Sequence, residues 1–328
     1  MENVYITKVI LEEVRNLTYA EIPLSAIEKK NLIITGKNGS GKTTVLNALA
    51  SYLNAVLKNN DVEHEKKYLK MDLYRVFTSA PFWIGVIGVY ITMNLMAKVG
   101  QPAIDVISRY KVMKFQSVTI AIFAFSSFAY GNALREDQEH HFWQNEILRG
   151  DLKSYIWSKV LSGFLAADIT VFAGQLLFFQ QDSFWHPLLM LEDEFFTANG
   201  VDLRGNCFGW FAMHGMPILY LVFSAIIFGL LGGILCLVSM LLSLLAKNQM
   251  FAICIPMAGY YFIVTYLGVL FPQGGIWDWN SLFMFSTDVF GNAWISLGYI
   301  FLMTILCVIV LGNLIAARVT KEIRGESM

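Results

Sequence analysis

Residues 217–246, PILYLVFSAIIFGLLGGILCLVSMLLSLLA, contain no charged side chain and decide the fold class of the chain. A helix needs about 20 apolar residues to cross ~30 Å of hydrocarbon, and this run exceeds that length. Comparable runs recur along the sequence, near 77–97, 115–134, 157–180, 217–246, 250–271 and 293–316. The sequence therefore predicts an α-helical integral membrane protein with six transmembrane helices.

Composition agrees with a lipid environment. Of 328 residues, 56% are hydrophobic and 15% are charged, with a mean hydropathy of +0.53, well outside the soluble globular range. Residues 1–75 hold 20 of the 49 Asp, Glu, Lys and Arg residues. The four cysteines show no C-x-x-C spacing, so neither a disulfide framework nor a zinc site is expected. The net charge of −1 gives no reason to expect nucleic acid at the membrane part.

Basic residues beside the six runs predict the orientation of the chain. With the N-terminus inside, the inner segments carry thirteen Lys and Arg residues and the outer segments carry five. Cytoplasmic loops are the ones enriched in Lys and Arg. We therefore expect a multi-pass protein of the cell (inner or plasma) membrane with both termini in the cytoplasm.

A phosphate-binding motif lies at the head of the chain. Residues 31–49, NLIITGKNGSGKTTVLNAL, match G-x-x-x-x-G-K-[ST], with an expected strand at 31–35 and an expected helix at 44–57. Backbone N–H groups and the helix N-terminus would hold the phosphates of ATP, Lys42 would reach the β- and γ-phosphates, and Thr43 would hold Mg²⁺. The expected nucleotide-binding residues are Gly36, Asn38, Gly39, Ser40, Gly41, Lys42, Thr43 and Thr44.

The rest of an ATP-hydrolysing site is not evident. Hydrolysis also needs an apolar strand that ends in acidic residues to hold Mg²⁺ and orient water. The nearest match, 188–194, lies between two apolar runs and on the opposite side of the membrane by helix counting. Residues 161–163, Leu-Ser-Gly, continue into an apolar helix rather than a transporter signature. We therefore do not expect a complete ATPase from this chain alone.

One carboxylate falls deep inside a predicted span. Asp168 lies in the run at 157–180, where an ionisable residue is by default a candidate for a transport or proton pathway. The alternative is a seam between helices, with Asp168 bonded to Thr170 or Gln175. Both interpretations remain open from the sequence.

Two cytoplasmic stretches resemble those of ABC-type-2 exporter permeases. These are YLKMDLYRVFTSAPFWIG at 68–85 and GNALREDQEHHFWQNEILRGDLKSYIWSKVLSG at 131–163. The resemblance, over about 66–322, implies a permease that works as a homo- or heterodimer with a separate ABC ATPase subunit. It also implies a coupling helix that docks on that subunit through Phe142, Trp143, Ile147 and Leu148. A further implication is an amphipathic helix on the inner leaflet before the first span.

Residues 5–49 are instead similar to the start of SMC- and RecF-like ATPases, which implies a short partial α/β segment. The expected domains are a partial P-loop segment at 1–57, a charged linker and amphipathic helix at 58–76, the permease domain at 77–316 and a tail at 317–328. Three functions stay open. The chain is a permease driven by a separate ATPase, a membrane-anchored ATP-binding protein with a complementing partner, or a permease whose N-terminal P-loop segment has no role in its function.

Overall fold

The computed structural model describes residues 8–14, 17–23, 61–99, 105–114, 119–139, 152–190, 203, 206–246, 249–267, 275–278, 282–284 and 288–323. The chain divides into two compact units, Met1–His64 and Glu65–Met328. In the first unit, β1 (Lys8–Val14) pairs antiparallel with β2 (Leu17–Pro23), in a register that runs from Lys8↔Pro23 to Val14↔Leu17. The expected strand at 31–35 and helix at 44–57 lie outside the described residues.

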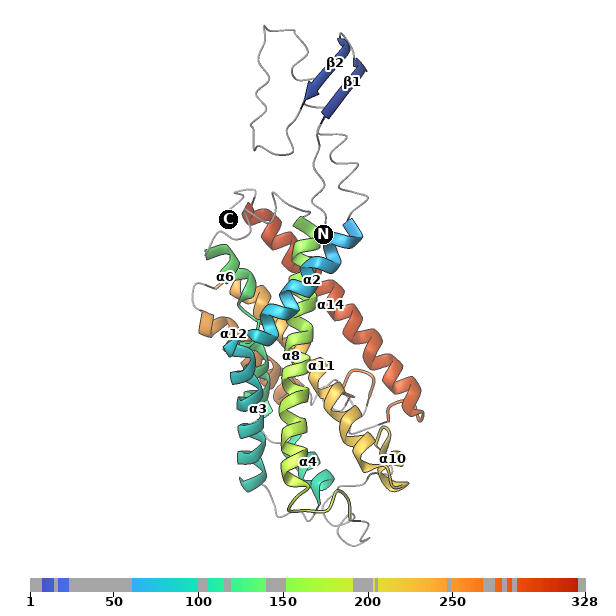
Figure 1. The fold of residues 1–328 in the computed structure, drawn as a ribbon. Coiled ribbons are helices and arrows are strands. Elements are labelled where there is room, and N and C mark those ends of the chain that lie inside the picture. Colours follow the sequence, from blue (N-terminus) through green and yellow to red (C-terminus); the bar gives the residue numbers. More distant parts are fainter. Residues whose placement is uncertain are drawn as a thin grey trace. The chain divides into compact units, whose positions relative to one another are not determined.

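The second unit is a bundle of helices, drawn in Figure 1. Its elements are α2 (Asp61–Thr78), α3 (Ala80–Val99), α4 (Val106–Lys114), α5 (Thr119–Phe128), α6 (Ala133–Glu139), α8 (Leu152–Asp182), α10 (Gly209–Met213), α11 (Pro217–Ser243), α12 (Gln249–Phe262), the π-helix η1 (Ile263–Leu267) and α14 (Ala293–Ile323). α2, α6 and the end of α14 lie together at one end, here called the α2 end. α4 and α10 lie at the opposite, α4 end.

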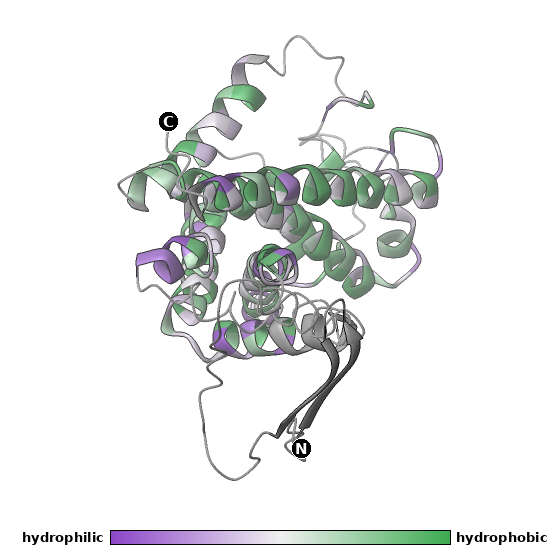
Figure 2. Ribbon diagram, turned by 90° about the horizontal axis from the view of Figure 1, so that it is seen from above, coloured by the Kyte–Doolittle hydropathy of each residue, from purple (hydrophilic) through white to green (hydrophobic). Residues whose placement is uncertain are grey.

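Four helices are long and apolar enough to cross a membrane, which indicates a multi-pass membrane protein. Their spanning stretches are Ala80–Lys98, Leu152–Asp182, Pro217–Ser243 and Ala293–Lys321, with α11 the most buried and α14 the least. Figure 2 shows the hydrophobic colour along most of the length of the bundle's helices. These four correspond to four of the six predicted spans, which confirms that part of the prediction.

The other two predicted spans are shorter in the described residues. The described part of the run at 115–134 yields α5, whose ten residues extend about 15 Å and end at a turn after Phe128 that leads directly into α6. The run at 250–271 yields the apolar helix Met250–Tyr266, which contains Pro256 and ends as the π-helix η1. A proline removes one backbone hydrogen bond from a helix, so a distortion is expected there. The six-helix prediction therefore holds for four long spans.

Glycines allow the central helices to approach closely. A Cβ on Gly174 of α8 would lie 2.6 Å from Val89 Cβ and 3.0 Å from the Val86 carbonyl oxygen of α3. A Cβ on Gly233 of α11 would lie 2.6 Å from the ring of Phe164. Small residues at such contacts are what lets membrane helices pack without a hydrophobic driving force between them.

We predict that Gly174→Ala lowers the thermal stability of the purified protein, because the added methyl meets a backbone carbonyl that cannot move aside. Overpacking of this kind costs about 1–3 kcal/mol. Gly259→Ala is the matched control, since nothing lies within 4 Å of a Cβ there and alanine favours the helix. Thermal unfolding in detergent, followed by circular dichroism, measures both. Equal melting temperatures for the two variants would contradict the close contact of α3 with α8.

Candidate functional site

Two buried acids from separate helices meet one buried lysine at the α2 end. Lys159 Nζ of α8 lies 2.8 Å from Asp72 Oδ1 of α2 and 2.9 Å from Asp137 Oδ2 of α6. All three residues are at most 3% exposed. We call Asp72, Arg75, Asp137 and Lys159, with the hydroxyls that bond them, the α2 clamp. It joins α2, α6 and α8 through charges that water cannot screen.

Hydroxyl groups complete the coordination of both carboxylates. Tyr130 Oη donates to Asp72 Oδ1 at 3.1 Å and Ser158 Oγ donates to Asp72 Oδ2 at 2.7 Å. Tyr155 Oη donates to Asp137 Oδ2 at 2.6 Å. A buried ion pair is tolerated only where additional hydrogen bonds satisfy the remaining lone pairs, and both acids meet that condition.

Arg75 adds the second positive charge of the clamp, so the four ionisable residues sum to zero. Its Nη1 lies 3.0 Å from Asp137 Oδ1, although half of the Arg75 side chain is exposed. Burial raises the pKa of Asp137, but the charge of Lys159 and the bonds from Tyr155 and Arg75 outweigh burial, so the net pKa is lowered. The stability that Asp137 contributes is therefore present above the ordinary aspartate pKa of about 3.9 and is lost as pH falls through the lowered value.

The spacing of residues on α2 explains why a charged residue is buried there. Asp72 and Val76, four residues apart, share the buried face of the helix. Met71, Tyr74 and Phe77 are exposed and form an apolar outer face. A helix thus occupies most of the stretch 58–76, with its inner face held by the clamp and an apolar outer face that could contact lipid.

Arg135 extends these connections from α6 to α11. Its Nε lies 2.8 Å from Glu139 Oε1, and its Nη1 donates to the carbonyl oxygens of Ser243 and Ala246. Those carbonyls end α11, where a cation favourably meets the negative end of the helix dipole. Arg135 therefore joins α6 to the end of α11, as Asp137 joins α6 to α8.

Asp168 lies midway along α8, and the residue is partly buried in the bundle. Its Oδ1 is buried, faces Gly229 of α11 and has no hydrogen-bond partner in the described part of the chain. A bond to Thr170 or Gln175 was the alternative. Thr170 instead donates to the Ala166 carbonyl oxygen, and Gln175 Oε1 accepts from Tyr110. Asp168 thus does lie at a contact between α8 and α11. The expected hydrogen bond from Thr170 or Gln175 to Asp168 is absent among the described residues.

The other predicted site residues lie outside the described residues. These are the nucleotide-binding residues at 36–44, with Thr43 as the Mg²⁺ ligand, and the coupling residues Phe142, Trp143, Ile147 and Leu148. The described ends of the coupling segment are close together, because Asp137 before it bonds Tyr155 and Lys159 after it. No group of three His, Cys, Asp or Glu residues that could hold a metal occurs among the described residues.

The sequence did not predict the α2 clamp. Lys159 entered only the count of basic residues in the inner segments, and the sequence patterns assigned no role to Asp72 or Asp137. The signal that could have found Asp72 is its i, i+4 pair with Val76 in the stretch 66–77 of α2, where the other positions are apolar or basic.

Comparisons with known proteins gave one match. A family model described as an AAA domain matches residues 8–151, which is less than half of the chain. The matched range contains the P-loop motif and continues through α2, α3, α4, α5 and α6, so its second half falls on helices of the membrane bundle. No curated protein and no solved structure matches the chain. The chain thus combines a P-loop region similar to an AAA domain with a set of candidate membrane helices.

We predict that Lys159→Met strongly destabilises the bundle, because it leaves Asp72 and Asp137 buried beside each other with one partly exposed arginine. Removing one partner of a buried ion pair costs about 3–5 kcal/mol. Lys153→Met on the same helix is the control, since Lys153 is exposed. Thermal unfolding in detergent compares the two, and equal stability of both variants would show that the clamp does not hold the helices.

Proposed function

We propose that this chain is the membrane subunit of an ATP-driven transporter, an exporter-type permease whose motor is a separate cytosolic ATPase. One observation carries the proposal: the residues that flank the segment 140–151 are bonded to each other and to α2. Asp137 of α6 accepts a hydrogen bond from Tyr155 and pairs with Lys159 of α8, and Lys159 also pairs with Asp72 of α2. A push on that segment would therefore move three helices as one body rather than bend a loose loop.

The proposed docking residues lie within this segment. Phe142, Trp143, Ile147 and Leu148 offer apolar side chains among Glu139, Glu146 and Arg149, a pattern suited to a hydrophobic groove on a partner. ATP binding and hydrolysis would take place in the partner. The chain itself would supply the pathway, through rearrangement of α8 against α11 and α3, as a homodimer or with a related second chain.

The proposed topology has six passes and places the α2 end at the cytoplasmic face. The bias of thirteen inner against five outer basic residues supports this orientation, as does the location of α2 and the end of α14 at the same end of the bundle. The exposed apolar face of α2 with Tyr74 and Phe77 would then lie in the inner leaflet. α5 and the apolar helix Met250–Tyr266 would account for the two shorter passes.

A second candidate function is favoured by the AAA-domain match and the complete P-loop motif. In this alternative, residues 1–57 bind ATP and Mg²⁺ through residues 36–44 and need a complementing polypeptide for hydrolysis, while the helices anchor the assembly in the membrane. When bound, the nucleotide would be held by the backbone N–H groups, Lys42 and Thr43.

We predict that Trp143→Ala lowers the amount of ATPase that co-purifies with the full chain in mild detergent at least tenfold. The removed indole is the largest apolar group of the proposed docking segment. Trp185→Ala, which removes an exposed tryptophan from the α4 end, is the matched control and should retain the ATPase. The ATPase that co-purifies with the control variant must itself contain a complete P-loop and an ABC-transporter signature motif. Equal retention by both variants would contradict docking through this segment.

The P-loop alternative predicts that Lys42→Ala lowers Mg-ATP binding to the purified full chain at least tenfold and abolishes its cellular activity while membrane insertion stays normal. Lys37→Ala, a change in the same loop at a variable motif position, is the control. Photolabelling with an ATP analogue measures binding. Unchanged Mg-ATP binding and cellular activity in Lys42→Ala would favour a permease whose N-terminal P-loop segment has no role in its function.

A further inference from the structure

Three polar side chains lie seven residues apart on one face of α8: Asp168, Gln175 and Asp182. Because seven residues turn a helix through almost two full turns, these side chains form a row, with about 10 Å between neighbours. Each has one buried polar atom without a hydrogen-bond partner in the described part of the chain: Asp168 Oδ1, Gln175 Nε2 and Asp182 Oδ2. Buried polar atoms of this kind are uncommon in folded proteins.

Asp168 ends the row near the middle of the membrane. It lies fourteen residues, about 20 Å, from the end of α8 at Asp182. Its Oδ1 rests against Gly229, where a Cβ would overlap it. Thus Gly229 provides the space that the carboxyl group occupies between α8 and α11.

No charge in the described residues compensates an ionised Asp168. The packed helices α5 and α11 contain no Asp, Glu, Lys, Arg or His residue. On α3, α6 and α14, the acidic and basic residues lie toward the helix ends: Lys98 on α3, Arg135 to Glu139 on α6, and Arg318 to Glu322 on α14. The neutral titratable groups of these helices are Tyr90, Tyr220, Cys236, Tyr299 and Cys307, and none bonds Asp168. An isolated carboxylate in such surroundings is costly, so the neutral acid is the stable form.

Gln175 connects the row to α4 and α11. Its Oε1 accepts a hydrogen bond from Tyr110 Oη at 2.8 Å, and Ser224 of α11 also hydrogen-bonds Tyr110. Gln175, Tyr110 and Ser224 are each at most 1% exposed. These three side chains form a buried polar cluster between the membrane centre and the α4 end.

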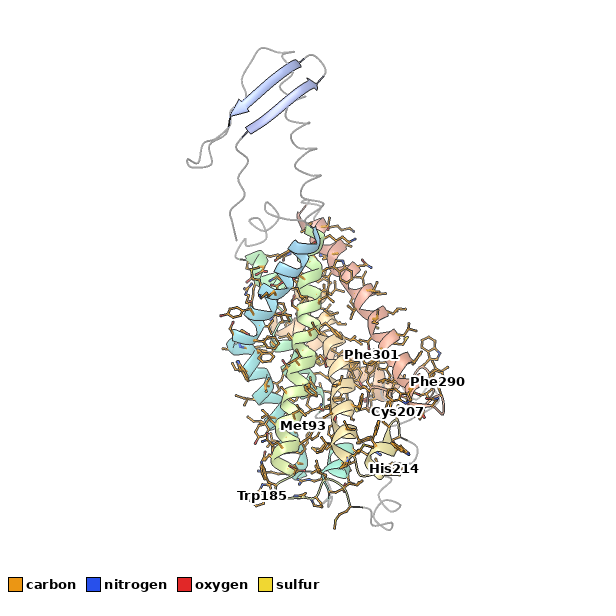
Figure 3. The ribbon with its side chains drawn as sticks, turned by 45° about the vertical axis from the view of Figure 1, so that its right-hand side comes forward. Met93, Trp185, Cys207, His214, Phe290 and Phe301 are labelled. Carbon is orange, nitrogen blue, oxygen red and sulfur yellow. The ribbon has the colours of Figure 1, made fainter. Side chains whose placement is uncertain are left out.

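Asp182 opens the row toward the α4 end. Its Oδ1 lies 2.7 Å from Arg109 Nη1, and the side chain of Arg109 is 16% exposed. Trp185, just beyond the end of α8 and 79% exposed, is labelled at this end of the bundle in Figure 3. The row therefore runs from a mostly buried ion pair at the α4 end to Asp168.

We infer that Asp168 is a proton-binding site, reached from the α4 end along Asp182, Arg109, Gln175 and Tyr110. A proton fits the site better than a metal cation, because Na⁺ or Ca²⁺ needs several oxygen ligands and Asp168 is a single carboxyl group beside a glycine. The inference requires only that α8 spans the membrane, and it does not rest on the proposed ATPase partner.

Proton occupancy would govern the contact between α8 and α11. The neutral carboxyl group fits against Gly229, whereas loss of the proton would place an uncompensated charge in that seam. The ionised form would be relieved by separation of the two helices and admission of water. The α8–α11 contact is thus a proton-sensitive joint in the centre of the bundle.

The experiment is infrared spectroscopy of the full chain in lipid vesicles, with the pH on each side set independently and the orientation fixed by protease access to a C-terminal tag. The readout is the carbonyl band of protonated carboxyl groups, in the difference between wild type and Asp168→Asn. We expect this band at neutral pH, and its loss when the pH is raised on the side of the α4 end. We also expect Gln175→Leu to slow that loss at least tenfold without removing the band.

Controls separate this outcome from a general effect of mutation. Asp288→Asn removes a carboxylate outside the helices, one that accepts a hydrogen bond from Ser296, and should leave the band unchanged. Asp168→Glu should retain a protonated-carboxyl band at a shifted frequency, which covers the case in which Asp168→Asn fails to fold. The inference is overturned if Asp168→Asn and Asp168→Glu leave the spectrum unchanged, or if the band follows the pH at the α2 end.

Discussion

Charge compensation in a medium without water is the constraint on which this structure depends. Backbone groups inside the membrane are satisfied by helices, and every buried side-chain charge must find its partner within the protein. The pairing of Lys159 with Asp72 and Asp137 meets this requirement at one end of α8, and Arg109 with Asp182 meets it at the other. α8 is thus fixed at both ends by ion pairs to other elements, while its centre contacts α11 and α3 through glycines.

This arrangement places ion pairs and hydrogen bonds between helices at the α2 end, and glycine contacts at the centre of α8. At the α2 end, the clamp and the bonds from Arg135 to the end of α11 join α2, α6, α8 and α11. Midway along α8, Asp168 has neither an ion pair nor a hydrogen bond in the described residues, and only a glycine opposes it. A force applied at the clamp and a proton bound at Asp168 would therefore act on the same pair of helices, α8 and α11. The proposed motor and the inferred proton site meet in that contact.

The sequence was reliable where the physical signal is local. Long apolar runs located α3, α8, α11 and α14, because hydropathy over about 20 residues is sufficient to identify a span. The same signal did not place the end of the helix in the run at 115–134, since apolar composition does not reveal that the chain turns after Phe128 and that Tyr130 bonds Asp72. Asp168 stood out as an acid within a span, but its neighbour Gly229 depends on the rotation of α11 about its own axis.

By itself, the sequence determined that lipid surrounds the larger part of the chain and that a P-loop motif precedes it, because solvent preference and a phosphate-binding pattern are both properties of contiguous residues. Only the tertiary structure decided which charges are partners. Arg75 and Asp137 are 62 residues apart, and Lys159 reaches both Asp72 and Asp137. Contacts at such separations are set by the packing and rotation of whole helices, which no local pattern encodes.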